Sequence, residues 1–219
     1  KRISAIATGI GPDNIDIVIN ELDALVNIDF KTRTINNKKK TLNIIRLGTS
    51  GALQKNIEVD SLIASSYALG LDNIAHFYES EDVIEKTISD KYEQHANFPK
   101  NLSKPYVVKA SDNLLSLFPE IKKGITATAP GFYGPQGRTL RLNPHISNLH
   151  EIMESFNYNE NRITNFEMET SALYYLGKSL GHNTLTICAI IANRLTKEYS
   201  KDYKKTVEKM IDLVLKRIC

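Results

Sequence analysis

The sequence is poor in cysteine and has no long hydrophobic run. Its 219 residues hold two cysteines, Cys188 inside an apolar stretch and Cys219 at the last position. Two cysteines placed in this way exclude a disulfide framework and favour a reducing, cytoplasmic location. No apolar run approaches the roughly 20 residues of a membrane helix, and the chain does not open with a basic and apolar leader. Neither a membrane anchor nor a secretion signal is therefore expected.

The sequence also lacks a linker and a strong excess of one charge. Its 28 basic and 25 acidic residues give a formal net charge of +3, and the densest basic run, Lys38–Lys40, is three residues long. This mixture is typical of a solvated surface, so nucleic acid is not an expected partner. No stretch rich in proline, glycine or serine divides the chain, of which 42% is hydrophobic. A single domain over residues 1–219 is expected.

The order of the apolar segments predicts an α/β fold. Residues 3–8 are expected to form a buried strand, which two glycines and a proline separate from a helix over about 12–26. A strand at 42–47 then ends in the glycine stretch 48–51, interpreted as a turn, and this order is typical of an α/β unit. Further strands are expected at 57–66, 106–110, 124–129 and 184–192, and further helices at 112–118, 144–156, 168–180 and 200–218.

Two weaker patterns complete the secondary-structure prediction. The segment 70–104 is polar and irregular, and its histidines and acids lack a metal-ligand spacing such as HExxH, so no metal site is expected. Thr164 and Glu167 have the spacing of a capping box, which predicts a helix start between them. The polar span 195–202 is interpreted as a loop.

Arg46 introduces the first of three polar stretches that follow predicted strands, where open α/β sheets bind ligands. An arginine inside an apolar strand needs an anion or a carboxylate to compensate it. The stretch behind it offers backbone N–H groups and the hydroxyls of Thr49 and Ser50, which together would form a phosphate cradle. A structural arginine paired with an acid, beside a plain glycine turn, is the alternative.

Gln136 and Arg138 form the second polar stretch. In an extended backbone, residues two apart share a face. An amide and a guanidinium can satisfy both carbonyl groups and the ring N–H of a pyrimidine, and Phe132 offers a surface for stacking. A surface loop that merely uses glycine and proline is the alternative.

Glu167 and Glu169 flank Met168 at the start of a predicted helix and form the third stretch. Acids are also favoured near any helix N-terminus, where they contribute a few tenths to ~1 kcal/mol. Arg194, which follows the predicted strand 184–192, could equally be a solvated strand end.

The motifs occur in a particular order along the chain. They are Thr8-Gly-Ile-Gly-Pro12, Arg46-x-Gly-Thr-x-Gly51, Phe132-Tyr-x-x-Gln-x-Arg138, Phe166-Glu-Met-Glu169 and Asn193-Arg194. In this order they resemble the motifs of the nucleoside phosphorylase family, most closely those of its uridine phosphorylase branch. Purine-directed relatives lack the Gln and Arg pair and typically carry an aspartate where Asn193 stands. The resemblance implies a three-layer α/β/α sandwich with a central mixed β-sheet.

The resemblance also implies a role for each matched residue. Phosphate would be bound by Arg46, Gly48 and Thr49. The base would be bound by Ser50, Gly51, Phe132, Gln136, Arg138, Ile190, Ile191 and Arg194. The ribose would be bound by Glu167, Met168 and Glu169. Glu169, Arg138 and Arg46 would be the catalytic residues, because they face the charges that develop on the sugar, the base and the phosphate.

The implied reaction is cleavage of uridine by inorganic phosphate to uracil and ribose 1-phosphate, without a cofactor or metal. The implied assembly is a homo-oligomer, either a dimer or a hexamer of three dimers. A monovalent cation at the dimer interface stays open, because Asp13 and Asn14 depart from the family motif after Pro12. A purine-directed phosphorylase, a nucleosidase and a nucleoside-binding pseudoenzyme are the alternatives.

The start of the chain departs from the family pattern. Family members begin with a further strand, a Gly-Asp-Pro turn and an arginine that binds phosphate, and they send another arginine and a histidine into the neighbouring subunit's site. None of these elements precedes Lys1. We therefore expect the chain to be a fragment that is incomplete at its N-terminus relative to the family.

Overall fold

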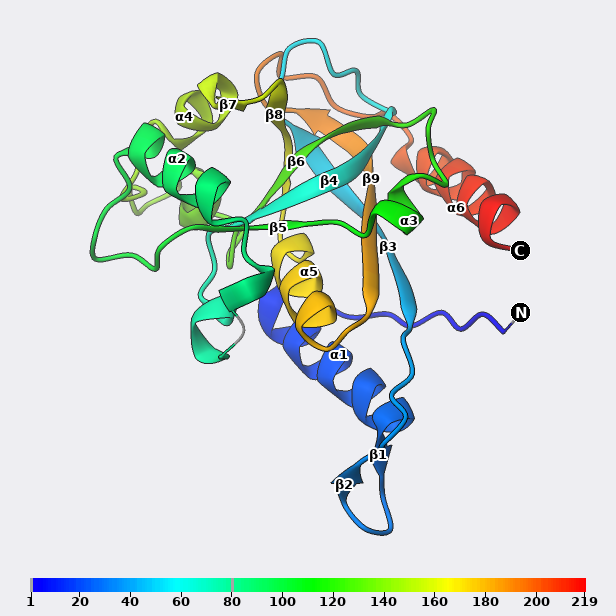
Figure 1. Cartoon of the computed structure of the whole chain (residues 1–219). Helices are drawn as coiled ribbons and strands as arrows, with labels where there is room; N and C mark the ends of the chain where they lie inside the picture. The colour runs from blue at the N-terminus through cyan, green and yellow to red at the C-terminus, as the bar shows by residue number, and fades with distance from the viewer. Residues whose placement is uncertain (1, 80) are drawn as a thin grey trace.

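A computed structural model describes residues 2–79 and 81–219. A central mixed sheet is covered by helices on both faces (Figure 1), which confirms the predicted three-layer α/β/α architecture. The helices are α1 (Pro12–Asn27), α2 (Lys86–Ala96), α3 (Asp112–Leu115), α4 (Leu149–Ser155), α5 (Thr170–Ser179) and α6 (Tyr203–Ile218), with 3-10 turns η1 (Ile74–Phe77), η2 (Glu81–Val83) and η3 (Gly134–Gln136). No helix in these described ranges is long and apolar enough to cross a bilayer.

The sheet follows the order β3-β9-β4-β6-β8-β7, with β5 added beside β4. Its strands are β3 (Asn43–Ala52), β4 (Leu62–Gly70), β5 (Tyr106–Lys109), β6 (Lys122–Thr128), β7 (Asn157–Tyr158), β8 (Asn161–Glu167) and β9 (Asn183–Asn193). β3 also pairs with β8 at one end, where Gly51 lies opposite Phe166. This pairing brings two of the predicted polar stretches together. The small strands β1 (Ile28–Asp29) and β2 (Thr34–Ile35) form a hairpin that projects beyond α1 (Figure 1).

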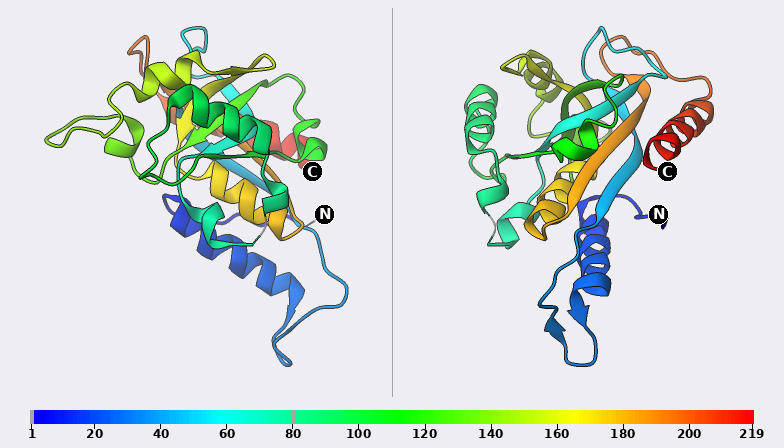
Figure 2. Two further views of the ribbon diagram at one scale, coloured as in Figure 1. Left: turned by 60° about the vertical axis from the view of Figure 1, so that its left-hand side comes forward. Right: turned by 45° about the vertical axis from the view of Figure 1, so that its right-hand side comes forward.

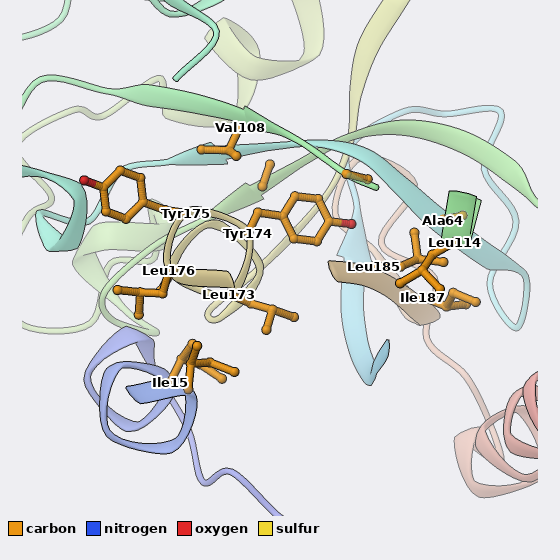
Figure 3. Packing of buried hydrophobic residues seen from close by; sticks show 14 of the residues in the cluster. Ile15, Ala64, Val108, Leu114, Leu173, Tyr174, Tyr175, Leu176, Leu185 and Ile187 are labelled. Carbon is orange, nitrogen blue, oxygen red and sulfur yellow. The ribbon is translucent and has the colours of Figure 1, made fainter. Parts of the chain in front are cut away.

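Helix α5 lies in the largest part of the core. All of its residues from Thr170 to Gly177 are buried, as expected for a helix that is covered all round. Figure 3 shows Tyr174 and Tyr175 directed to different sides of α5, with Ile15 of α1 near the same helix. α6 packs on the face of β3 and β9 that lies opposite α5 (Figure 2). A second cluster joins α2 and α4 to the sheet, with Tyr92 and Phe156 in edge-to-face contact. The burial of its first eight residues fixes the start of α5 in the fold.

The predicted strand at 3–8 is wrong. Residues 2–9 form neither helix nor strand, and Ile3 and Ile6 are 47% and 55% exposed. An apolar segment becomes a strand only when a neighbouring strand satisfies its backbone groups, and these residues pair with no strand of the described chain.

The glycine stretch 48–51 is not a turn, because β3 continues through it to Ala52. Its glycines serve a different purpose. A Cβ atom at Gly48 would lie 2.3 Å from Nη1 of Arg46, and a Cβ at Gly51 would lie 2.8 Å from Nε of Arg194. Glycine is therefore needed to make room for two guanidinium groups, rather than to reverse the chain.

Several predicted boundaries are also wrong. β4 begins at Leu62 and continues past Ser65, which was expected to end the strand. The Ser65 hydroxyl instead forms a hydrogen bond with the hydroxyl of Thr126 in the neighbouring strand β6. Helix α2 was missed in the segment 70–104. The predicted helices at 112–118 and 144–156 are shorter, as α3 and α4. Thr164 and Glu167 lie in β8, so they form no capping box.

Candidate active site

The candidate site forms where β8 ends and α5 begins. Glu167 is the last residue of β8, is 4% exposed, and pairs across the sheet with Thr128 of β6. Its carboxylate accepts hydrogen bonds from the Thr128 hydroxyl at 2.6 Å, from the N–H of Glu169 at 2.9 Å and from the N–H of Thr170 at 3.1 Å. Glu167 therefore caps the N-terminus of α5, which was the alternative interpretation of these acids. It also faces an arginine.

That arginine is Arg46 of β3. Its Nη1 lies 3.1 Å from Oε2 of Glu167, and its Nη2 pairs closely with Oε2 of Glu169. Burial lowers the pKa of Arg46, but the neighbouring Glu167, Cys188 and Glu169 raise it, and the net shift is upward. The guanidinium is thus a permanent cation held between two carboxylates. The carboxylate pairing anticipated as the structural alternative for Arg46 is what the structure contains.

Glu169 joins three distant parts of the chain. It is 6% exposed, and its second oxygen, Oε1, accepts a hydrogen bond from the N–H of Gly11 at 2.7 Å. Gly11 precedes α1 with φ 99°, a conformation that favours glycine. Burial raises the pKa of the Glu169 carboxyl, against the opposing effect of Arg46. Gly11 is a site residue that sequence reasoning did not single out, although the Gly-Ile-Gly-Pro pattern before the helix marks it.

Only some of the other residues predicted to bind ligands near this ion pair lie on the same side of the strand as Arg46. Alternation along β3 places Gly48 and Ser50 on the face of Arg46 and directs the half-buried Thr49 to the other face. Ser50 accepts a hydrogen bond from Asn165 at 2.9 Å. Met168 is half-buried between the two glutamates.

Cys188 is a second neighbour that the sequence did not reveal. It lies opposite Gly48 in β9, and its sulfur is 3.8 Å from Nη1 of Arg46. Burial raises the pKa of this thiol to about 11. Cys188 is therefore a neutral thiol that lines the buried side of the arginine.

Gln136 is the centre of a second group. It is 2% exposed, and its Oε1 accepts hydrogen bonds from Nη1 of Arg138 at 2.6 Å and from Nη2 of Arg194. The prediction of an extended backbone here is wrong, because Gly134–Gln136 is a 3-10 turn and Gly137 has φ 69°. The turn nevertheless brings both side chains together. Nε2 of His150 lies 2.8 Å from the carbonyl oxygen of Gln136, and this hydrogen bond stabilises the turn.

Both arginines of this group lie over aromatic rings. The guanidinium carbon of Arg138 is 3.7 Å from the ring centre of Phe132, which is 50% exposed. The guanidinium carbon of Arg194 is 5.2 Å from the ring centre of Phe166. Burial, and then the charge of Arg138, lower the pKa of Arg194. Arg194 is therefore not the solvated strand end considered as an alternative.

Asn193 is fixed by hydrogen bonds at both ends of its amide. Its Nδ2 donates to the carbonyl groups of Gln54 and Ile57 at 3.0 and 2.9 Å, and its Oδ1 accepts from the N–H groups of Leu195 and Thr196. The side chain thus holds the turn that presents Arg194. It is not available to exchange a proton with a ligand.

The two groups are adjacent. Nε2 of Gln136 lies 3.4 Å from the carbonyl oxygen of Glu167, so contacts run from Arg138 through Gln136 and Glu167 to Arg46. A cavity of about 1020 Å³ is lined in part by Tyr133, Pro135 and Arg138, and its described lining does not include Arg46, Gln136 or Glu169.

The apolar residues predicted for the base pocket are placed differently from one another. Ile190 is fully buried in a cluster with Ala52, Ile57 and Ile63, and Ile191 is half-buried. Within residues 2–79 and 81–219, no group of three His, Cys, Asp or Glu side chains is arranged to hold a metal ion. The charged groups of the site contact one another through ion pairs and hydrogen bonds.

Several known proteins are similar to this chain in sequence or in structure. The uridine phosphorylase of Thermococcus kodakarensis is 30% identical over 203 residues, which cover 93% of this chain and 62% of that protein. A DeoD-type purine nucleoside phosphorylase of Brevibacillus brevis is 29% identical over 219 residues, covering 98% of this chain and 74% of that protein. The crystal structure of a Trypanosoma brucei nucleoside phosphorylase, described as showing uridine phosphorylase activity, superposes with a TM-score of 0.79 at 26% identity, over 97% of this chain and 78% of that one.

The chain therefore spans about three fifths to three quarters of the length of these enzymes. The family model described as Phosphorylase superfamily matches residues 1–218. A match over nearly every residue, together with the shared fold, establishes the family. This chain belongs to the phosphorylase superfamily.

Proposed function

We propose that this chain is a nucleoside phosphorylase that cleaves a pyrimidine nucleoside, uridine above all, with inorganic phosphate to give the free base and ribose 1-phosphate. The observation that carries the proposal is the amide of Gln136 held by two arginines, Arg138 and Arg194. Relatives named uridine phosphorylase support it, from Thermococcus kodakarensis and Haemophilus influenzae at 30% and 25% identity. The proposal needs no cofactor or metal.

The Gln136 group suits a base that leaves with negative charge. Two guanidinium groups offer N–H donors to the carbonyl oxygens of uracil, and the glutamine amide can adjust its remaining contacts to the ring. Phe132, under Arg138, provides an apolar face for the ring. Donors directed at a developing oxyanion stabilise the transition state, and the loss of one typically costs about 2.7–4 kcal/mol of barrier.

Asn193 favours a pyrimidine over a purine. A purine leaves most easily when an acid protonates its ring nitrogen. The Asn193 amide instead donates to two backbone carbonyl groups and cannot act as an acid. Departure of the base would then depend on the hydrogen bonds from Gln136 and the two arginines.

The Arg46 group suits phosphate and ribose. A guanidinium has five N–H donors, so Arg46 can bind phosphate oxygens while Glu167 still orients it. Glu169 supplies a negative charge and hydrogen-bond acceptors for the ribose hydroxyls, which would stabilise the positive charge on the sugar as the bond breaks. Met168, between the glutamates, would lie against the sugar ring.

The proposal is tested by incubating the protein with uridine, with and without phosphate, and by following uracil and ribose 1-phosphate. Product should form only with phosphate, and inosine should react far more slowly than uridine. Equal rates with inosine would contradict the choice of base. Sedimentation of the same sample tests the homo-oligomer, a dimer or a hexamer, that we include in the proposal.

A nucleosidase is the second candidate, and one observation favours it. Arg46 is already paired with both Glu167 and Glu169, so water rather than phosphate could attack the sugar. In that case uracil and free ribose would appear in phosphate-free buffer at the same rate as with phosphate.

A further inference from the structure

Asp72 is a buried carboxyl group that the proposed chemistry does not use. It follows β4 and is 2% exposed. Its Oδ1 accepts hydrogen bonds from the hydroxyl of Tyr106 at 2.7 Å and from the N–H of Ile74 at 2.9 Å, and its Oδ2 accepts one from the hydroxyl of Ser171 at 2.5 Å. Burial raises the pKa of Asp72, and the hydrogen bonds from Ser171 and Tyr106 oppose that shift. A carboxyl in this position needs an explanation beyond packing.

The surroundings of Asp72 leave it little freedom. A Cβ atom at Gly70 would lie 2.5 Å from the ring of Tyr106, so this ring is packed directly against the backbone of β4. The same ring is in edge contact with Tyr175 of α5, at 5.9 Å between ring centres. Tyr106, Asp72 and α5 therefore form one rigid unit.

Ser171 carries the influence of Asp72 toward the site. It lies in the first turn of α5, and its N–H donates to Oγ1 of Thr128 at 3.0 Å. Because that oxygen accepts from Ser171, the Thr128 hydroxyl proton is directed to Oε1 of Glu167, at 2.6 Å. Glu167 in turn pairs with Arg46 at 3.1 Å. Each step is a directional contact, and all of these groups are buried except the partly buried guanidinium of Arg46.

We propose that Asp72 is a positioning residue for the phosphate and ribose site. By holding Ser171, it fixes the first turn of α5 and with it the direction of the Thr128 hydroxyl and the Glu167 carboxylate that orient Arg46. Asp72 acts only through these groups and takes no part in bond breaking. The inference deepens the proposed function and rests on it.

The test uses Asp72→Asn, which replaces the acceptor oxygen facing Ser171 by an amide nitrogen, and Ser171→Ala, which removes the hydroxyl that donates to it. Asp60→Asn is the matched control, because Asp60 also accepts hydrogen bonds from two hydroxyls, those of Ser200 and Thr206, at the start of α6. Two quantities are measured: amide hydrogen exchange in the segment 167–175, and the KM values for phosphate and for uridine.

Both site variants should show faster exchange at the start of α5 and a KM for phosphate raised about tenfold, the effect of one lost buried hydrogen bond. The KM for uridine should change less, and the control should match the wild type in both measurements. Wild-type exchange in Ser171→Ala, or faster exchange with an unchanged KM for phosphate, would overturn the inference.

The experiment also distinguishes a folding failure of one variant from a failure of the proposed function. If Asp72→Asn does not fold, Ser171→Ala carries the test, since alanine is well tolerated in helices. If the wild type neither cleaves uridine nor gains thermal stability from phosphate, the proposed function fails. The exchange measurement then still supports or overturns the hold of Asp72 on the first turn of α5.

Discussion

The guanidinium of Arg46 occupies the space where a side chain at Gly48 would begin, since a Cβ there would lie 2.3 Å from its Nη1. The arginine folds back along its own strand and reaches Glu167 and Glu169 only because the residue two positions on is glycine. The Arg-x-Gly spacing is thus a steric requirement of the ion pair.

Gly48→Ala should therefore impair the site more than the fold. The guanidinium is the end of a flexible side chain, so it should yield to the new methyl group and leave the glutamates. We expect the KM for phosphate to rise at least about tenfold and the stability to fall by about 1–3 kcal/mol. Chemical denaturation and steady-state kinetics measure the two effects. In an Arg46→Ala background the same methyl group should cost almost nothing, and an equal cost in both backgrounds would refute this explanation.

Glu169→Gln should lower kcat by about 10²–10³, because it removes the negative charge that faces the sugar in the transition state. The amide oxygen can still accept the hydrogen bond from Gly11, and Glu167 still pairs with Arg46 after the ion pair to residue 169 is lost, so folding should be retained. Thermal unfolding checks this retention, and a variant with wild-type kcat would rule out the proposed role.

The pH dependence should reveal the same group. Because burial raises the pKa of Glu169, this carboxyl takes up a proton at a higher pH than an ordinary glutamate. Activity should therefore decline on acidification at a pH above the usual glutamate range, and the decline should be absent from the residual activity of Glu169→Gln. The profile of kcat against pH for both proteins provides the measurement.

Arg138→Ala should affect the nucleoside and spare phosphate. The guanidinium donates to Gln136 and covers Phe132, while the contacts of Arg46 lie on the other side of Glu167. We expect kcat/KM for uridine to fall by about 10²-fold or more, with the affinity for phosphate within about threefold of the wild type. Phosphate affinity is measured by its effect on thermal unfolding, and a parallel loss of both affinities would show that the two groups are not separate.

Asn193→Asp should destabilise the protein without creating activity toward purines. A carboxylate cannot donate to the carbonyl groups of Gln54 and Ile57, so two buried acceptors would lose their partner. We expect a loss of about 1–3 kcal/mol, measured by denaturant unfolding, and no gain of inosine cleavage. Efficient inosine cleavage by this variant would show that the position selects the base directly.

The sequence predicted the fold class better than the geometry of the polar stretches. The apolar run in β9 and the stripe of α1 determine those elements strongly, because burial on one face dictates the residue pattern. Helix α2 was missed although Ile88, Tyr92 and Ala96 repeat at every fourth position, since polar residues outnumber them. The strand at 3–8 was predicted wrongly, because an apolar composition says nothing about the presence of a partner strand.

The candidate site shows the same division. Gln136 and Arg138 do meet, but through a 3-10 turn instead of an extended backbone. Arg46 does meet an anion in this structure, and it is a pair of glutamates. Gly11 and Cys188 join the site through pairings that span most of the chain, and such pairings leave no local pattern in the sequence.

The pairing of Gly51 with Phe166 has a consequence for how the protein is made. The hydrogen bond from Arg46 to Glu169 spans 123 residues, and that from Gly11 to Glu169 spans 158. Closing segments of this length is slow and entropically costly until the intervening sheet exists. During synthesis on the ribosome, the charged centre can therefore assemble only after the start of α5 has emerged.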